Sequence, residues 1–596
     1  MIGIPPAFIF IIGALLVPLV TGRARPPYLA AVGLIGLAAT LLISPQTSWV
    51  VGLLPEFDLV LLHADGLSLL AGGVFAFAGL LALIYAGRLP STAHHTAALL
   101  YMGGALGVVF AGDFFTVFFF WEIMAIASLV LIWFGGYPRS ADAGFRYILL
   151  HIFGGSCLLG GIAIQYAATG SIAVGPVDAG AGYMLMLIGI GVNAAFIPLH
   201  TWVPDAYPEA TIYGSVFLSI FTTKAAIYLL ARTFPGLEAL AYMGALMVVY
   251  GAVFALFQND IRRILSYSIV SQVGYMVAGI GIGTAIGLSA GAAHLVNDIL
   301  FKALLFMGMG AVILSTGKSN LTELGGLARK MPITAAFCII GAAAAAGIPG
   351  LNGFVSKGMV TEAAHAAHLD PLSLVLAGSS LITLVYMARL IYYTFFARND
   401  AISAEEAPFP MLAAMGGTAA ACIIIGVFPG LLLAVLPFAE HYDPFSLGHL
   451  LESGAVILGA AVLFVLGRRA LAPRTWVLSD VDILYRRAGT GFVWFCQTPL
   501  PGFADAIGTV QQAIIDRLAW FTQNPVDATK LIGGWIVLPV AKVFLPEESV
   551  RDFEEDLMKT QEKYPGDPAR LRSTGYGIFL ASLFFLFYFV IFYLTV

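Results

Sequence analysis

The sequence predicts an all-α polytopic membrane protein. Of its 596 residues, 60% are hydrophobic and only 11% are charged, and the mean hydropathy is +0.92. A water-soluble protein of this composition would expose apolar patches large enough to cause aggregation. Apolar segments of about 20 residues also recur along the chain, which is the length that crosses a hydrocarbon core about 30 Å thick.

The expected membrane spans follow from these apolar segments. Arg23 and Arg25 come after the first segment rather than before it, which is the wrong order for a cleaved signal peptide, so we expect it to remain as a permanent span. The expected spans lie near 7–21, 28–44, 65–86, 97–112, 114–134, 146–168, 181–198, 211–233, 239–257, 264–283, 286–314, 333–365, 372–396, 411–436, 450–469 and 573–595.

Two of these spans contain residues that break a helix. Pro198 interrupts the seventh span, and Pro349 interrupts the twelfth between Gly347 and Gly350. Proline removes a backbone donor and clashes with the preceding turn, and glycine permits the bend. Broken helices at corresponding places in two halves indicate inverted repeats with an ion site between them, although simple kinks are an alternative.

The domain division follows from these repeats and from the composition after about residue 473. We expect N-terminal helices in 1–96, a first inverted repeat in 97–233, a second in 239–396, peripheral helices in 397–470, an amphipathic or lateral and charged segment in 471–572, and a terminal transmembrane helix in 573–596. Apolar residues recur at helical spacing in 501–522, which predicts an amphipathic helix that lies on the membrane or contacts partner subunits. The alternative is that this region is a passive tether for the last helix. The apolar segment 531–545 could span the membrane, lie at its interface or form a re-entrant segment.

The loop charges predict the orientation. Most arginine-bearing loops follow odd-numbered spans, whereas acidic residues such as Asp58 and Asp443 follow even-numbered ones. The positive-inside rule therefore places the N-terminus outside a prokaryotic-type cytoplasmic (inner) membrane. Asp205 and Arg232, which follow the seventh and eighth spans, break this pattern.

Three ionisable residues share one stripe of the eleventh span. His294, Asp298 and Lys302 are spaced four residues apart, so a helix carries them on one face. Ionisable side chains in a membrane span are costly and usually mark a function. A polar packing cluster that ties two helices together is the alternative.

Further ionisable residues lie in other spans. Glu122 lies inside the fifth span, where movement of a neighbouring charge could switch its protonation. The alternative is a structural Glu122 whose hydrogen bond stabilises a contact between two helices. Lys224 lies inside the eighth span and could carry a proton or extend to an interface. Lys357 follows the second break by eight residues and would face a hydrated cavity. His151, His200 and Asn193 are possible relays, although a lone histidine is more often a packed polar residue.

The row of titratable groups suits ion conduction better than enzyme chemistry. No phosphate-binding loop, zinc-protease motif or nucleophile elbow is present, so we expect no cofactor, no metal and no nucleic acid partner. The four cysteines, which predict neither disulfides nor an iron–sulfur site, are Cys157, Cys338, Cys422 and Cys496.

Several motifs together resemble those of a known family. They are Trp121-Glu122, Pro198-Leu-His200-Thr-Trp202-Val-Pro204-Asp205, Asp260-Ile-Arg-Arg263-Ile-Leu-Ser-Tyr267-Ser268, Phe301-Lys302-Ala-Leu-Leu-Phe306 and Gly353-Phe-Val-Ser-Lys357. Over about residues 60 to 400 the chain resembles the antiporter-like subunits of respiratory complex I, Mrp-type cation/proton antiporters and membrane-bound hydrogenases, with the Mrp D-type subunit the most similar branch. The resemblance implies about 14 core helices with two inverted five-helix repeats, and ion transport within a larger complex.

The resemblance also implies roles for individual residues. Glu122 would act in the first half and Lys302 with Lys357 in the second, with Lys224 and His294 connecting them. Two positions depart from the family pattern: Asn193 stands where the family usually has a lysine, and Asp298 replaces a second histidine. Glu122 therefore lacks its usual ammonium partner unless Lys224 replaces it.

The sequence leaves several functions open. The leading hypothesis is a proton- or sodium-translocating subunit of a multisubunit membrane complex, with other membrane subunits and the lipid bilayer as partners. The driving reaction could be antiport, a redox reaction of hydrogenase, formate- or NADH-oxidising partners, or carbon dioxide hydration; in a redox complex this chain would hold no redox centre. A structural subunit with an inactive first-half channel is the alternative of another class, and Asn193 is its best support.

Overall fold

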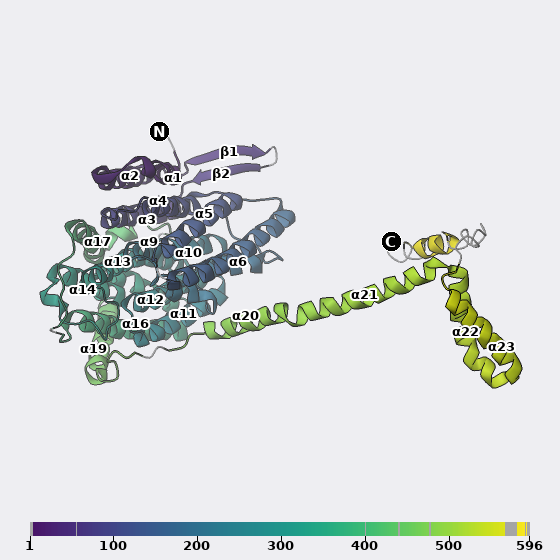
Figure 1. The fold of residues 1–596 in the computed structure, drawn as a ribbon. Helices are drawn as coiled ribbons and strands as arrows, with labels where there is room; N and C mark the ends of the chain where they lie inside the picture. The colour runs from purple at the N-terminus through teal and green to yellow at the C-terminus, as the bar shows by residue number, and fades with distance from the viewer. Residues whose placement is uncertain are drawn as a thin grey trace. The chain divides into compact units, whose positions relative to one another are not determined.

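The protein was analysed as a computed structural model, which describes residues 4–54, 57–136, 138–399, 401–438, 442–475, 478–566, 581–589 and 592. The chain forms two compact units, residues 1–482 and 483–596, and each is described by itself. Figure 1 labels the main helices and strands of both units.

The first unit is built from helices and one hairpin. Its elements are α1 (Pro6–Leu16), η1 (Val17–Leu19), η2 (Gly22–Ala24), α2 (Arg25–Leu41), β1 (Ser48–Leu54), β2 (Phe57–His63), α3 (Gly66–Ala86), α4 (Thr92–Phe110), α5 (Phe114–Trp133), α6 (Pro138–Thr169), α7 (Tyr183–Asn193), η3 (Leu199–Thr201), α8 (Trp202–Ala206), α9 (Ile212–Ile220), α10 (Thr222–Thr233), α11 (Glu238–Phe257), α12 (Ile261–Ile282), α13 (Ala285–Thr316), η4 (Leu327–Arg329), α14 (Pro332–Ala346), α15 (Asn352–Ala366), α16 (Asp370–Ile391), η5 (Tyr392–Phe396), α17 (Phe409–Val427), α18 (Gly430–Leu433) and α19 (Leu447–Gly467).

The all-α membrane fold is confirmed. Within the described ranges, 12 helices are long and apolar enough to cross a membrane, and Pro6–Leu19, Tyr183–Asn193 and Pro332–Ala346 are shorter apolar helices. The antiparallel hairpin β1–β2, which lies between the second and third expected spans, was not predicted. Its segment is too short to span, and its many branched and aromatic residues favour a strand.

Both predicted helix breaks are present. α7 ends at Asn193, and the chain passes Pro198 before η3 and α8 continue it. α14 ends at Ala346, and Gly347 follows with a φ of +83°, a left-handed conformation that favours glycine, before α15 begins at Asn352. The expected single spans 181–198 and 333–365 are therefore each interrupted.

A third break was not predicted. The expected span 211–233 divides into α9 and α10 at Phe221, although the segment has neither proline nor glycine there. Side chains satisfy backbone groups that the break releases: the Tyr101 hydroxyl accepts from the Thr222 amide at 3.0 Å, and Lys224 donates to the Ser219 carbonyl at 2.8 Å. Non-helical backbone at membrane depth requires such partners.

The same local pattern recurs in the two halves. α6 and α13 each have 32 residues. Asp113 caps α5 and pairs by a β-bridge with Ala173, which follows α6, and Asp260 caps α12 and pairs with Asn320, which follows α13. Both aspartates satisfy free amides at a helix N-terminus.

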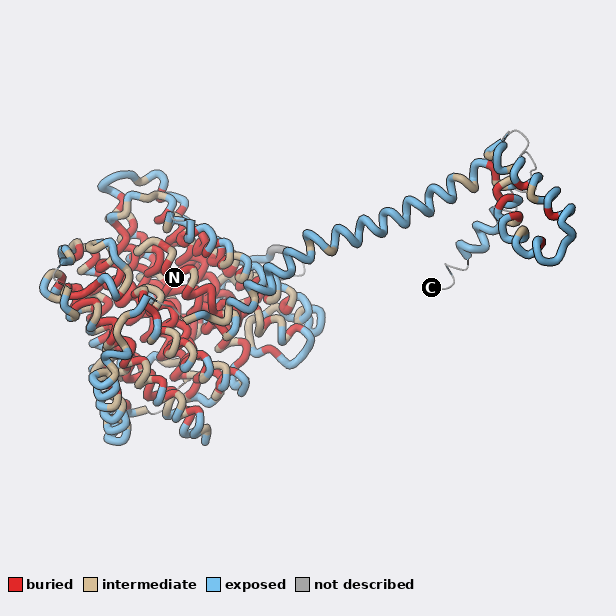
Figure 2. The backbone as a smooth tube through the Cα atoms, turned by 60° about the horizontal axis from the view of Figure 1, so that its bottom comes forward, coloured by how far each residue is buried: buried red, intermediate tan, exposed pale blue. Residues whose placement is uncertain are grey.

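α12 and α13 form the centre of the first unit. All residues in 264–281 and in 289–312 are buried, so the polar side chains of both helices lie inside the protein. Figure 2 shows buried residues concentrated in this unit. α19, by contrast, has Ala460 as its only buried residue.

The second unit contains α20 (Asp482–Gln497) from its second residue on, α21 (Pro499–Gln523), α22 (Pro525–Phe544), α23 (Glu547–Lys563) and the described part of the C-terminus. α21 contains the predicted amphipathic helix 501–522 and has no buried residue (Figure 2). α22 and α23 pack together, with Leu557 seated against Gly534, and α22, which contains most of 531–545, is not among the 12 candidate spans. The expected span 573–595 lies mostly outside the described residues.

Candidate functional site

An ion pair between α10 and α13 lies at the centre of the first unit. Lys224 Nζ lies 2.7 Å from Asp298 Oδ2, and both side chains are 0% exposed. Lys224 also donates to the Ser219 carbonyl, which the break before α10 leaves free. The structure therefore places this ammonium in the interior and gives it a partner from the second half, not from Glu122.

The other two residues of the α13 stripe contact different helices. His294 Nδ1 lies 2.9 Å from Ser356 Oγ of α15. Lys302 Nζ donates to Ser268 Oγ of α12, which in turn lies 2.7 Å from the hydroxyl of Tyr386 on α16. One face of α13 thus brings polar groups of four other helices, α10, α12, α15 and α16, into one buried cluster.

Lys357 lies at the edge of this cluster. Its Nζ is 4.8 Å from the centroid of the Tyr275 ring and has no hydrogen-bond partner in the part of the chain that the structure describes. The Tyr275 ring in turn lies 5.4 Å from the ring of His294. Tyr275 is fixed by donation of its hydroxyl to the Leu376 carbonyl at 2.8 Å. A cation over an aromatic face keeps some stabilisation without a counter-ion.

Glu122 lies on α5 and contacts α6. A Cβ at Gly155 would lie 2.3 Å from Glu122 Oε1, so the glycine makes room for the carboxylate. Within the described ranges Glu122 forms no ion pair. Because Asn193 stands where the family usually has a lysine, Glu122 was expected to lack an ammonium partner, and Lys224 does not take that place.

His151 lies on the same helix as the glycine that contacts this first-half carboxylate. His151 precedes Gly155 by one turn of α6 and stacks on Tyr147, with 3.8 Å between the ring centroids. Its Nδ1 lies 2.9 Å from the Tyr147 carbonyl. Among the residues that the structure describes, neither His151 Nε2 nor the amide of Asn193 has a hydrogen-bond partner.

His200 interacts with an acidic residue that the sequence analysis missed. Asp480 lies 3.4 Å from His200 Nε2 and accepts hydrogen bonds from the hydroxyls of Tyr250 and Tyr267. Burial acts to raise the pKa of Asp480, but His200 and the two tyrosines overcome this and lower it to about 2. Nothing local in the sequence signals this contact, because Asp480 lies 280 residues after its histidine partner.

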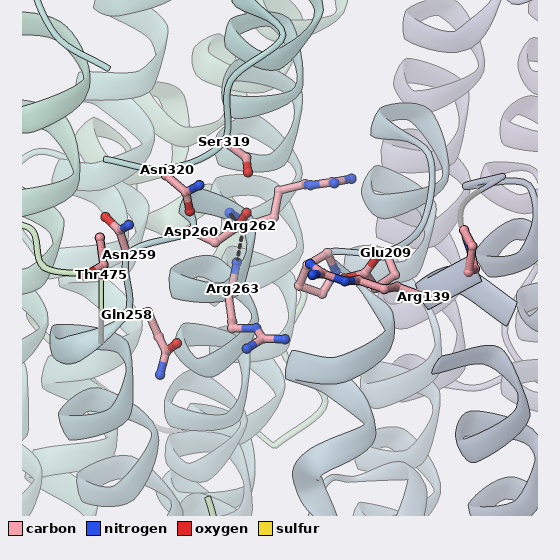
Figure 3. A pocket seen from close by; sticks show the side chains of 12 residues that line it. Arg139, Glu209, Gln258, Asn259, Asp260, Arg262, Arg263, Ser319, Asn320 and Thr475 are labelled. Carbon is pink, nitrogen blue, oxygen red and sulfur yellow. Dashed lines mark hydrogen bonds between the residues drawn. The ribbon is translucent and has the colours of Figure 1, made fainter. Parts of the chain in front are cut away.

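A basic cavity of about 600 Å³ opens elsewhere, at the start of α12 (Figure 3). Arg139, Arg262 and Arg263 line it together with Glu209 and Asp260. Asp260 Oδ1 already accepts from the amide of Arg263 at 2.9 Å, as the dashed line in Figure 3 shows. None of the expected site residues lines this cavity, and its excess of arginines does not favour a cation there.

The comparisons with known proteins agree with the fold. A family model described as "NADH:quinone oxidoreductase/Mrp antiporter, TM" matches residues 111–383. The chain is 33% identical over 430 residues to the NADH-quinone oxidoreductase subunit N of Desulforudis audaxviator, covering 66% of this chain and 85% of that protein. It is 31% identical over 436 residues to the Na(+)/H(+) antiporter subunit A1 of Staphylococcus haemolyticus, covering 65% of this chain and 54% of that protein.

A solved structure has the same fold. The match to a chain in the structure of the Mrp complex from Dietzia sp. DQ12-45-1b has a TM-score of 0.67 at 23% identity, and it covers 76% of this chain and 98% of that one. The resemblance inferred from the motifs around Glu122, Lys302 and Lys357 is thereby confirmed at the level of the family. The chain belongs to the family of membrane subunits that NADH:quinone oxidoreductases share with Mrp antiporters.

Proposed function

We propose that the chain is a proton-translocating, antiporter-like subunit of a multisubunit membrane complex. The observation that carries this proposal is the buried Lys224–Asp298 pair, which is flanked on α13 by His294 and Lys302. Two fully buried charges are costly even when paired, and the pair can exchange a proton when either partner moves. The names of the relatives, a quinone oxidoreductase subunit and an antiporter subunit, agree with ion translocation.

We arrange the buried and half-buried ionisable groups into one route through the subunit. In the first half, Glu122 and His151 lie on either side of the α5–α6 contact at Gly155. The Lys224–Asp298 pair connects the halves. From there His294 and Lys302 lead toward Lys357, with Tyr275 between His294 and Lys357.

We assign the two halves of this route to inverted repeats, 97–233 and 239–396. The equal lengths of α6 and α13, the matching caps Asp113 and Asp260, and the breaks after α7 and α14 support this division. Inverted repeats with broken helices place ion sites near the bilayer midplane. The buried pair between α10 and α13 lies where such halves would meet.

Protons fit this route better than sodium ions. Lys302 and Lys357 end the route, and an ammonium group carries a proton but repels a metal cation. In the described ranges no group of three or more His, Cys, Asp or Glu residues could hold a metal ion. A sodium site would need several oxygen ligands in one place.

We place the N-terminus outside a cytoplasmic membrane, as the loop charges predict, and assign the apolar face of α21 to neighbouring subunits. The identity of the co-purifying subunits would reveal the driving reaction. Purification of the native complex would show antiporter subunits for antiport, iron–sulfur proteins for a redox reaction, or a zinc protein for carbon dioxide hydration.

A structural subunit is the second candidate function, and Asn193 favours it. A neutral amide at this position cannot act as a proton carrier, so the first half lacks one titratable group of the family pattern. The titratable groups of the second half are all present. If the subunit is purely structural, it carries no protons, and substitutions at Lys302 and Lys357 should leave translocation by the complex intact.

Proteoliposomes that contain the native complex would test the proposal. Proton uptake is measured with a pH-sensitive dye while the partner subunits are supplied with their driving substrate or ion gradient. Lys302→Ala and Asp298→Asn should each abolish proton uptake. Replacement of sodium by choline should leave the proton uptake that passes through the wild-type subunit unchanged. Normal uptake in both variants would leave the structural role as the remaining function.

A further inference from the structure

We propose that His449 and Glu452 of α19 form the outer end of the proton route and connect Lys357 with the solvent. This inference rests on the proposed function, because it assigns an exit to the proton that Lys357 carries. α19 belongs to the segment that the sequence analysis treats as peripheral, and no family motif quoted above includes it.

Two adjoining cavities lie between Lys357 and the surface. The inner one has a volume of about 40 Å³ and is lined by Lys357, Ser380, His449 and Glu452. The outer one has a volume of about 650 Å³ and is lined by Glu362, Tyr442, Asp443, His449 and Glu452. A space of about 15 Å³ or more with polar walls is enough for one water molecule, so the inner cavity can hold a water beside the Lys357 ammonium.

Gly358 is what allows His449 to reach this cavity. A Cβ at residue 358 would lie 2.0 Å from His449 Cε1 and 2.3 Å from Nε2, so any larger residue would displace the ring. The ring also stacks on Phe354, one turn earlier on α15, with 4.4 Å between the centroids and 5° between the planes. Phe354 and Gly358 together hold the imidazole against α15, next to Lys357.

The tautomer of His449 follows from its hydrogen bond. Its Nδ1 lies 2.8 Å from the carbonyl oxygen of Pro444, and a carbonyl only accepts, so Nδ1 carries the hydrogen. The Nε2 atom of the neutral ring is therefore the acceptor, and it lies on the side of Gly358. His449 thus presents a proton acceptor toward the lysine and not toward the loop.

The proton transfer balances with these groups alone. The Lys357 ammonium gives one proton to the cavity water, and that water gives one proton to His449 Nε2. The imidazolium then releases the proton to Glu452 or to water in the outer cavity, and the ring returns to its neutral form. Glu452 lies three residues after His449 on the same side of α19, and it is exposed whereas His449 is partly buried, so the groups are ordered from inside to outside.

The charges around the outer cavity favour this direction. Glu362, Asp443 and Glu452 place three carboxylates at its walls. Burial and these three carboxylates raise the pKa of Tyr442, whose side chain also lines the cavity. A negative cavity attracts a released proton and raises its local concentration. Asp443 also lies in a loop that the positive-inside rule places outside.

The test compares His449→Phe with a matched control. Phenylalanine keeps the stacking on Phe354 but cannot accept a proton, so we expect proton translocation by the native complex in proteoliposomes to fall at least about fivefold. His365→Phe makes the same chemical change at the outer cavity, where the ring already pairs with Asp370 at 3.0 Å and is away from Lys357, and it should leave the rate unchanged.

Lys302→Ala in the same assay separates the two proposals. If Lys302→Ala retains translocation, the proposed function fails. If Lys302→Ala abolishes translocation while His449→Phe keeps the wild-type rate, the proposed function holds and the proposal of an outlet at His449 is overturned.

Cysteine labelling tests the outlet without transport. Thr361 lines both cavities, so Thr361→Cys should react with a small membrane-impermeant thiosulfonate added on the side of Asp443, in a parent with Cys157 and Cys496 replaced by serine. Prior labelling should also block proton translocation. A thiol at 361 that reacts only from the opposite side, or not at all, would overturn the outlet.

Discussion

Lys224 Nζ lies 2.7 Å from Asp298 Oδ2, and this contact joins the two halves of the first unit inside the protein. Each side chain provides the counter-charge of the other, because an unpaired charge at this depth would be strongly unfavourable. The pair also explains how a chain with Asn193 in place of a lysine keeps a buried ion pair: the pair lies between the halves and not within the first half.

The first prediction separates the structural role of this pair from its role in transport. Asp298→Asn leaves the Lys224 ammonium without its counter-charge, and we expect it to destabilise the protein by about 3–5 kcal/mol. The double variant Lys224→Met with Asp298→Leu removes both charges and should recover most of that stability, but it should not translocate protons. Thermal unfolding of the purified complex and dye-monitored proton uptake measure the two effects. Recovery of transport in the double variant would contradict the proposed role.

The second prediction concerns Glu122 and the glycine that accommodates it. Glu122→Gln keeps the shape of the side chain and removes its titration. We therefore expect proton translocation to fall by about 10²-fold, the lower end of the range for positioned acid–base groups. Gly155→Ala should have a similar effect, because the new Cβ would displace the carboxylate. Gly160→Ala is the control on the same helix, since its Cβ would meet its nearest neighbour at 3.7 Å. Unchanged transport in Glu122→Gln would exclude a role for this carboxylate.

The third prediction tests whether Lys357 must titrate. Lys357→Arg keeps a positive charge at this position, but a guanidinium does not release its proton, so translocation should be lost. Lys318→Arg is the matched control, because Lys318 is exposed and pairs with Glu323 at 3.1 Å. Proton uptake in vesicles distinguishes the two variants. A Lys357→Arg complex with the wild-type rate would show that the charge at 357 matters and its proton does not.

The fourth prediction is a pH dependence at Asp480. Its pKa is lowered from an ordinary value of 3.8 to about 2, so its contacts with His200, Tyr250 and Tyr267 contribute stability above pH 4 that is lost as the pH falls toward 2. Hydrogen–deuterium exchange of peptides that cover 478–482, corrected for intrinsic rates, should show protection at pH 6 that disappears in this acidic range.

Asp480→Asn provides the comparison for this measurement. The amide cannot lose a charge, so the protection of 478–482 in this variant should be weaker at pH 6 and should not change between pH 6 and pH 2.5. Wild-type protection that is equally independent of pH would contradict a stabilising role for the ionised Asp480 carboxylate.

The fold class, most of the spans and the two proline-associated breaks could be predicted from the amino-acid sequence. Composition and segment length act locally, and Pro198 and Pro349 remove hydrogen bonds in their own turns, so these features need no tertiary information. The sequence also identified Glu122, Lys224 and Lys357 as ionisable residues inside apolar segments; the structure buries the two lysines and leaves Glu122 half-buried.

Which of these groups contact one another depends on how the helices pack. The break at Phe221 depends on Tyr101, whose hydroxyl accepts from the Thr222 amide, and the partner of Lys224 is Asp298 because α10 packs on α13. His449 lines the same cavity as Lys357 because Gly358 leaves room for its ring. A side chain's type is local, but its partner is selected by the packing of helices that are distant in the sequence, and no periodicity within one helix encodes that choice.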